Sequence, residues 1–217
     1  MKNYVITIMD NEKSVKAADR CIKSGQSVGG LEIEKWPATT PRDDINMMAA
    51  NEGVNTTAMN EVYSRTSNCL AAFLSHYRLW KWSAQNNEEI TIFEHDAVCV
   101  NNIPTHINYK GIISLGKPSY GKYNTPLGLG VNKLTSKRYF PGAHAYRIKP
   151  NAAKMLVQQA RFEAKPTDVF LNLESFAFLQ EYYPWPVEAR DSFTTIQSEH
   201  GCLAKHNFNK NYEIVDV

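Results

Sequence analysis

The alternation of apolar and polar positions at the start of the chain predicts a strand, a helix and a second strand. Residues 4–9 form an apolar run rich in β-branched side chains, which is typical of a strand buried on both faces. Asn11 is a candidate helix cap, and apolar residues then recur at helical spacing over 15–22, until Gly25, which can end the helix. Residues 31–36 predict the second strand, so the chain opens as β-α-β, the beginning of a parallel sheet.

Helical spacing of apolar residues and short apolar runs predict most of the elements in the rest of the chain. Residues 116–138 are rich in Gly, Pro, Asn, Tyr and Lys and predict a loop over a site. The chain after Tyr183 reads as irregular, with a candidate strand at 212–215. The remaining predictions are a short helix near 45–50, a helix from Ser67 with an apolar stripe from Leu70 to Trp80, strands at 90–93, 111–115 and 143–148, a helix beginning at Pro150, and a helix from Thr167 through Phe178.

Length and composition fit one globular domain, 1–217, of the α/β class. Apolar residues make up 43% of the chain and charged residues 21%, which is ordinary for a soluble protein. We therefore expect a mixed, mostly parallel sheet flanked by helices. No apolar run approaches the roughly 20 residues that cross a bilayer, and no secretion signal follows Met1, so we expect a cytoplasmic protein without a membrane span. The four cysteines show no metal-binding spacing.

Charge is distributed unevenly, although the net charge is only +2. Residues 97–162 contain ten Lys and Arg and no Asp or Glu, so the rest of the chain has 24 − 10 = 14 cations against 22 acids, a net of −8. This polarity favours an anionic ligand, either a diphosphate or a polyanion, over the basic segment. The alternative is that these cations are solvated separately on loops. The ten are Lys110, Lys117, Lys122, Lys133, Lys137, Arg138, Arg147, Lys149, Lys154 and Arg161.

Two acidic residues, Glu94 and Asp96, follow the strand predicted at 90–93. Side chains two positions apart in an extended segment point the same way, so the two carboxylates would share one face and His95 would point away. If the backbone turns there, His95 is a candidate third ligand. Carboxylates of this kind suit Mg²⁺ or Mn²⁺ shared with substrate phosphates, and ligands of open parallel sheets bind at the carboxyl ends of strands. The sequence therefore predicts a metal–diphosphate site here. It contains no P-loop, dinucleotide fingerprint or nucleophile elbow.

The helix at 68–80, with Leu-Ser-His at its centre, and the Glu94-His95-Asp96 triplet together resemble the family 25 glycosyltransferases. That family includes lipooligosaccharide and collagen galactosyltransferases, and its pattern is a small-residue helix with Leu-Ser-His followed by a strand that ends in Glu-Asp-Asp. The middle acid is His95 here, which is a departure from the pattern. The resemblance runs from about Tyr4 to Gln197. Other segments that resemble the family are Gly142–Tyr146, Pro166–Asp168 and Ser192–Ile196.

The resemblance implies a GT-A type, Rossmann-like fold and inverting transfer of a sugar from a nucleoside diphosphate, UDP above all, to an acceptor hydroxyl. It implies Mn²⁺ or Mg²⁺ as the cofactor. For His76 and His144 the alternative is a purely structural histidine, and for Asp168 an acid that only favours the helix dipole. The expected roles are metal binding for Glu94, Asp96 and His144, general base for Asp168 with Asp191 in reserve, contact with the nucleotide for Ile8, Ser75, His76 and Glu94, and a phosphate clamp for Lys137, Arg138 and Arg147.

The acceptor is left open between two classes of polymer. The family's usual role implies a lipooligosaccharide or another glycan. The basic segment 110–161 interleaves cations with aromatic side chains, which favours DNA, and phage enzymes glycosylate hydroxymethylated pyrimidines that are flipped out of the duplex. We rank the DNA acceptor slightly first. His95 in place of an acid motivates a third hypothesis, a catalytically silent module that binds a nucleotide sugar or nucleic acid.

Overall fold

The computed structural model describes residues 1–59 and 66–190, and within them seven strands form one sheet in the order β2-β1-β3-β7-β5-β8-β6. β2, β1 and β3 are parallel, and the pairings of β7, β5 and β8 give β5 and β8 the same direction as β3. The predicted mixed, mostly parallel sheet is therefore confirmed. The strands are β1 (Lys2–Thr7), β2 (Glu34–Pro37), β3 (Ile90–Glu94), β5 (Ile112–Ser114), β6 (Gly130–Lys133), β7 (Ala145–Ile148) and β8 (Gln180–Tyr183).

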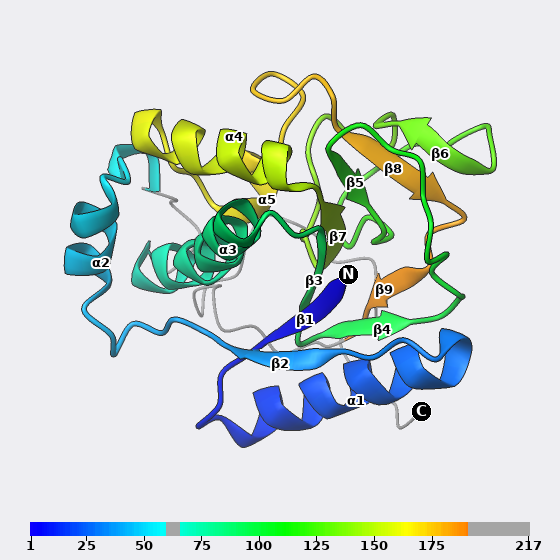
Figure 1. Ribbon diagram of the computed structural model, residues 1–217, viewed down its shortest axis with the longest axis horizontal. Helices are drawn as coiled ribbons and strands as arrows, with labels where there is room; N and C mark the ends of the chain where they lie inside the picture. Colours follow the sequence, from blue (N-terminus) through cyan, green and yellow to red (C-terminus); the bar gives the residue numbers. More distant parts are fainter. Residues whose placement is uncertain (60–65, 191–217) are drawn as a thin grey trace.

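Helices cover both faces of the sheet (Figure 1). One core cluster joins Tyr4 and Ile6 of β1 to α3 and α4, and a second joins Val5, between them, to α1. Alternate residues of a strand point to opposite faces, so the continuous apolar run of β1 serves both cores. A small antiparallel sheet of β4 (Ala97–Cys99) and β9 (Val187–Ala189) lies against α1. The helices are α1 (Glu12–Gly29), α2 (Ile45–Glu52), the 3₁₀ turn η1 (Thr57–Met59), α3 (Thr66–Asn86), α4 (Pro150–Phe162) and α5 (Thr167–Phe170).

The first helix begins where the sequence predicts and ends later. The Asn11 side chain accepts a hydrogen bond from the backbone N–H of Ser14, which satisfies a free donor of the first turn. The prediction that Gly25 ends the helix is wrong, because α1 continues to Gly29 and Gly30 adopts the left-handed conformation beyond it. Gly25 instead lies where Ile33 packs, and a Cβ there would be 2.7 Å from the Ile33 Cδ1 atom.

The apolar stripe predicted on the long helix is confirmed as the centre of the larger core. Its members from Leu70 to Trp80 are all 5% exposed or less. The Phe73 and Phe170 rings meet edge to face at 5.2 Å, and Trp80 stacks on Phe170 at 5.5 Å. Aromatic pairs of this geometry add to the stability gained from burial alone. The packing fixes α5 beside α3.

Several predictions fail where short elements depend on tertiary contacts. The segment 116–138 is not all loop, since it contains β6, and the chain after Tyr183 contains β9. The helix predicted from Thr167 through Phe178 stops at Phe170, because Phe140 donates a backbone hydrogen bond to the Leu171 carbonyl and draws the chain away. The candidate strand at 212–215 lies outside the described residues. None of the helices in the described part of the chain combines the length and apolarity needed to span a membrane.

Candidate active site

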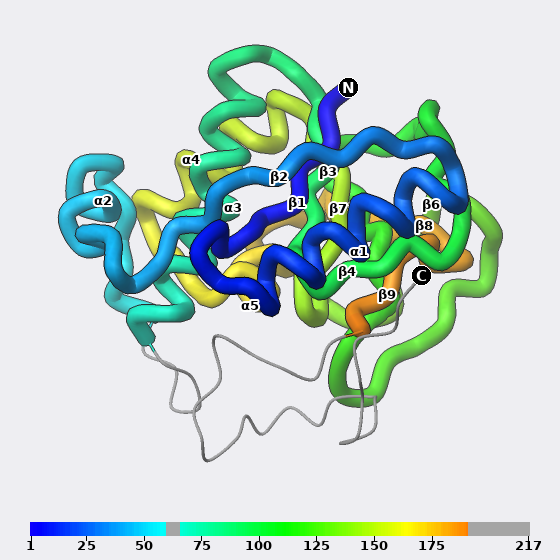
Figure 2. Tube along the Cα trace, turned by 90° about the horizontal axis from the view of Figure 1, so that it is seen from below, coloured from blue at the N-terminus to red at the C-terminus, as the bar shows by residue number. Residues whose placement is uncertain are grey.

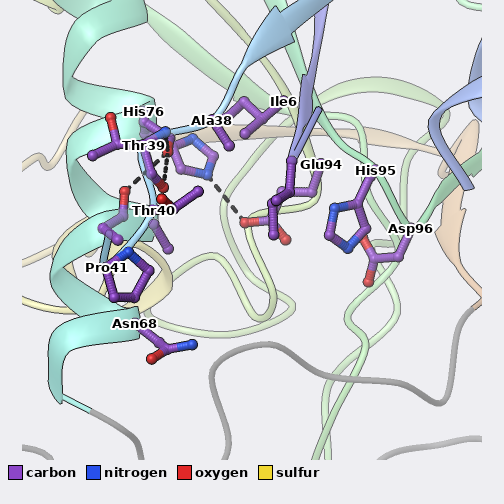
Figure 3. A pocket seen from close by; sticks show the side chains of 14 residues that line it. Ile6, Ala38, Thr39, Thr40, Pro41, Asn68, His76, Glu94, His95 and Asp96 are labelled. Carbon is purple, nitrogen blue, oxygen red and sulfur yellow. Dashed lines mark hydrogen bonds and ion pairs between the residues drawn. The ribbon is translucent and has the colours of Figure 1, made fainter. Parts of the chain in front are cut away.

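A pocket of about 140 Å³ opens at the carboxyl ends of β1 and β3 (Figure 3). Its walls come from the end of β1, the segment 38–41 that follows β2, the first turns of α3, and the residues 94–96. Ile8, Ser75, His76, Glu94 and Asp96, which were predicted as binding residues, all line it. The parallel strands therefore bring together side chains that are up to 90 positions apart, from Ile6 to Asp96.

Helix α3 fixes one wall of the pocket. The Ser75 hydroxyl accepts a hydrogen bond from the backbone N–H of Thr39 at 2.8 Å, and it donates to the Ala71 carbonyl at 2.9 Å. The Arg78 guanidinium donates to the Pro37 carbonyl at 3.1 Å and lies over the Trp36 ring. Ser75 is 1% exposed. It thus shapes the wall by holding the segment after β2 in place.

The acidic pair does not keep the alternation expected of an extended segment. β3 ends at Glu94, and His95 and Asp96 form the turn to β4. Figure 3 shows Glu94 directed toward His76 of α3, with Asp96 beyond His95, and all of them line the pocket. His95 is held by α1, because its Nδ1 atom is 2.9 Å from the Ser14 hydroxyl. His95 thus faces α1, whereas Glu94 faces α3 on the other side of the sheet, so these two neighbours point in opposite directions.

A chain of buried hydrogen bonds runs from α3 to Glu94. The indole N–H of Trp80 donates to the Tyr146 hydroxyl at 2.7 Å, which lies 2.8 Å from His76 Nδ1, and His76 Nε2 is 3.0 Å from Glu94 Oε1. His76 and Tyr146 are 1% and 0% exposed. Burial lowers the pKa of His76 to about 3 and raises the pKa of Glu94 to about 7. His76 is thus a neutral imidazole that ties one oxygen of Glu94 to the core.

The neutral His76 makes a testable contribution to acid stability. The unfolded chain binds a proton on this side chain below pH 6.5 and the folded chain does not, so the free energy of unfolding falls as pH drops from 6.5 toward 3. Glu94 contributes the opposite trend below about pH 7, and His76→Gln retains that carboxyl. We expect the free energy of unfolding of the metal-free wild type, measured in urea, to fall by about 3 kcal/mol more than that of His76→Gln between pH 7 and 4. Parallel pH curves for the two proteins would contradict a neutral His76.

Asp168 lies close enough to the pocket for its charge to act on both His76 and Glu94. Its carboxylate accepts hydrogen bonds from the Tyr120 hydroxyl and from the Val169 N–H at 2.9 Å. Burial raises the pKa of Asp168, while these donors act in the opposite direction. Asp168, the predicted general base, thus lies near His76 and Glu94 of the pocket. Asp191, the reserve base, lies outside the described residues.

His144 is buried beside Asp96 and is not one of the residues lining the pocket. It is 2% exposed, burial lowers its pKa, and the Asp96 charge acts against that shift. The ring packs on Gly116, where a Cβ would come within 2.5 Å of the His144 Nε2 atom. His144 is therefore buried near Asp96 and outside the pocket.

Gly116→Ala tests this packing. The added methyl group displaces a buried imidazole, so we expect the mutation to destabilise the protein by about 1–3 kcal/mol in urea unfolding. In a His144→Ala background the same mutation should cost much less, because its steric partner is gone. An equal cost in both backgrounds would show that the His144 ring does not fill this position.

The expected phosphate clamp is not assembled at the pocket. Arg147 is 0% exposed, and its guanidinium donates to the Thr91 hydroxyl at 3.2 Å and the Pro104 carbonyl at 3.1 Å. It follows Tyr146 on β7 and so faces the other side of the sheet from α3. Arg138 is exposed and pairs with Glu174 at 3.2 Å. Lys137 lies over the Tyr120 and Tyr139 rings.

Sequence reasoning missed several polar residues of the site. Thr39, Thr40 and Asn68 line the pocket, and Tyr120 bonds to Asp168. The only signal for the threonines was their position just after a strand at the carboxyl edge. Within residues 1–59 and 66–190, no three His, Cys, Asp or Glu side chains lie close enough together to hold a metal ion by themselves.

Comparison with known proteins finds a family model that matches this chain and solved structures that resemble it at low sequence identity. Residues 2–171 match the model of glycosyltransferase family 25, described as an LPS biosynthesis protein. The crystal structure of the apo-form glycosyltransferase GlyE of Streptococcus pneumoniae TIGR4 aligns at 8% identity and a TM-score of 0.43, over 83% of this chain and 44% of that one. A second GlyE crystal structure from the same organism aligns at 9% identity and a TM-score of 0.41, over 84% of this chain and 45% of that one. This chain spans less than half the length of either structure. No curated protein matches it significantly in sequence.

The family match covers the elements that build the pocket. It begins in β1 and continues through α3, the 94–96 turn and β7 to the end of α5. It also covers Asp168 and well over half of the 217 residues. The prediction of a glycosyltransferase is thus confirmed at the level of the family. The chain belongs to glycosyltransferase family 25.

Proposed function

We propose that the chain transfers a sugar from UDP to a hydroxyl group of a glycan, with inversion at the anomeric carbon. The observation that carries the proposal is the grouping of Glu94 and Asp96 in a pocket at the carboxyl ends of parallel strands. Thr39, Thr40 and Asn68 add hydroxyl and amide groups on the opposite wall, which suit the hydroxyls of a ribose and the polar edge of a base.

The donor set fits a divalent cation of the Mg²⁺ or Mn²⁺ type. Such a cation is held by one or two carboxylates together with substrate phosphates, so it needs no all-protein cage. Asp96 would hold it, and Glu94 has one oxygen left after its contact with His76. His144 is buried near enough to Asp96 for the two side chains to interact electrostatically. When bound, the ion supplies Lewis-acid stabilisation of the departing diphosphate.

Asp168 is the general base in this proposal. Its carboxylate takes the proton of the acceptor hydroxyl as the hydroxyl oxygen bonds to the anomeric carbon and the bond from that carbon to the diphosphate breaks. Burial raises its pKa, which makes it a better base than an ordinary carboxylate. The Tyr120 hydroxyl holds the carboxylate in one orientation. Attack on the face opposite the diphosphate gives inversion.

The acceptor is a glycan rather than DNA in this proposal. Several cations of the basic segment are occupied: Arg147 is buried, and Lys117 and Arg138 pair with Glu188 and Glu174. This leaves fewer charges for a nucleic-acid backbone than the sequence suggested. The description of the family as an LPS biosynthesis protein points in the same direction.

A donor screen tests the proposal. Purified protein is incubated with nucleoside diphosphate sugars, Mn²⁺ and either glycan or hydroxymethylated DNA acceptors, and the released nucleotide is measured. We expect release from a UDP-sugar that stops with a chelator and increases with glycan. Release that needs the DNA would reverse the choice of acceptor. No release from any donor, together with UDP binding that ignores the metal, would favour the silent binding module.

A further inference from the structure

The turn before β6, residues 126–129, holds two apolar side chains fully in solvent. Leu127 is 106% exposed and Leu129 is 81% exposed, the highest values among the large apolar side chains of the described residues. Single exposed leucines are common, but two that flank one glycine form a local apolar tip. Neither contributes to the pocket or to the cores. We call residues 126–129 the leucine tip.

The leucine tip is held by hydrogen bonds rather than left loose. The Asn132 side chain donates to the carbonyls of Gly128 at 2.8 Å and Gly130 at 3.0 Å. At the base, the Asn124 N–H donates to the Ser136 carbonyl at 3.0 Å. The Pro-Leu-Gly-Leu sequence is thus presented outward by an ordered turn. A fixed turn loses little conformational entropy when it binds a surface.

Sheet topology places the leucine tip at the carboxyl ends of the parallel strands, where the pocket also lies. β6 is antiparallel to β8, and Gly130 at its start pairs with Tyr183 at the carboxyl end of β8. β8 runs in the same direction as β3, whose carboxyl end is Glu94. Figure 1 shows β6 and β8 at the side of the sheet away from α2, and Figure 2, turned by 90°, shows the same separation.

The surroundings of the leucine tip are aromatic and cationic. Trp185 packs edge to face against Tyr183 at 5.1 Å and Tyr123 at 5.6 Å. Lys122 is exposed beside them, and Lys133 is exposed at the other end of β6, opposite Gln180. The tip lies within the 97–162 segment that contains no acidic residue. The nearby Glu181 of β8 is 0% exposed, and its carboxylate accepts the Thr135 and Ser136 N–H groups.

We propose that the leucine tip inserts into the surface of an anionic lipid bilayer and holds the pocket edge of the molecule at that surface. Apolar side chains enter the acyl boundary, tyrosines lie at the headgroups and lysines meet anionic lipid, which is the composition found here. Two leucines are too few for permanent anchoring, so the association is reversible. The inference stands without the proposed sugar transfer; together they imply that the acceptor is borne by a lipid.

Vesicle flotation tests the inference without any assay of activity. We expect the protein to float with vesicles of phosphatidylglycerol and phosphatidylcholine, and to float less with phosphatidylcholine alone or at high salt. The double variant Leu127→Ser and Leu129→Ser should lower binding by at least about tenfold, since each serine removes most of the buried apolar area. The control is Phe162→Ser, which changes a 75% exposed apolar side chain at the end of α4. Circular dichroism checks that both variants stay folded.

Three results would overturn the inference. The first is wild-type protein that stays out of the floating fraction with both vesicle types. The second is an equal loss of binding in the double variant and in Phe162→Ser, which would mean general stickiness. The third is a change in oligomeric state in the double variant without lipid, since the leucine tip would then be a contact between protein chains.

Discussion

Asp96→Asn lowers sugar transfer by at least about a hundredfold in our account, because the amide cannot replace the carboxylate that would hold the cation against the diphosphate. The substitution keeps the shape of the side chain. Nucleotide release from a UDP-sugar, with and without added Mn²⁺, measures the effect.

The matched control is Asp19→Asn on α1. That carboxylate is 59% exposed and pairs with Lys35, so its loss should leave both activity and stability within experimental scatter. Urea unfolding should give nearly equal midpoints for the two variants. Near-normal turnover by Asp96→Asn would remove the acidic pair from the mechanism.

Asp168→Asn has the second large effect, a loss of about 10²–10⁴-fold in transfer to the acceptor with unchanged UDP binding. Asp168 acts as a base only when ionised, so transfer in wild type is lost as pH falls through its raised pKa. The Tyr120 hydroxyl bond lowers that pKa. In Tyr120→Phe the acidic limb of the kcat/KM profile should therefore move to higher pH.

Glu174→Gln is the control for this prediction. Glu174 follows α5 on the same segment, is 77% exposed and pairs with Arg138. The Glu174→Gln variant should show the same sugar transfer and the same pH profile as wild type. A Tyr120→Phe profile that coincides with wild type, or an Asp168→Asn variant that transfers sugar normally, would exclude Asp168 as the base and direct attention to Asp191.

Long periodic elements could be predicted from the sequence, and short ones stabilised by partners elsewhere could not. Helix α3 has an apolar stripe over many turns, and β1 and β3 are continuous apolar runs. β8 could not be predicted because its buried position 181 is a glutamate. Its carboxylate accepts hydrogen bonds from the backbone N–H groups of residues 135 and 136. No local pattern contains that information, because the partner is about 46 residues away.

The same distinction applies to the site. Glu94 and Asp96 could be located because they follow an apolar strand at the edge where ligands bind. The alternation rule failed only beyond Glu94, where the chain turns. Arg147 was misjudged because a guanidinium in a basic segment reads as exposed, whereas β7 carries it into the molecule against Thr91. Burial of a charge depends on neighbouring strands, which the linear pattern does not specify.

A crystal structure of the protein with UDP and Mn²⁺ would show whether the pocket beside Glu94 and Asp96 binds the donor. We expect the uridine to lie against the wall made by residues 38–41 and α3, and the metal to lie between the pyrophosphate and the carboxylate of Asp96. Nucleotide bound elsewhere on the molecule, or a pyrophosphate and metal that make no contact with residues 94–96, would contradict this expectation.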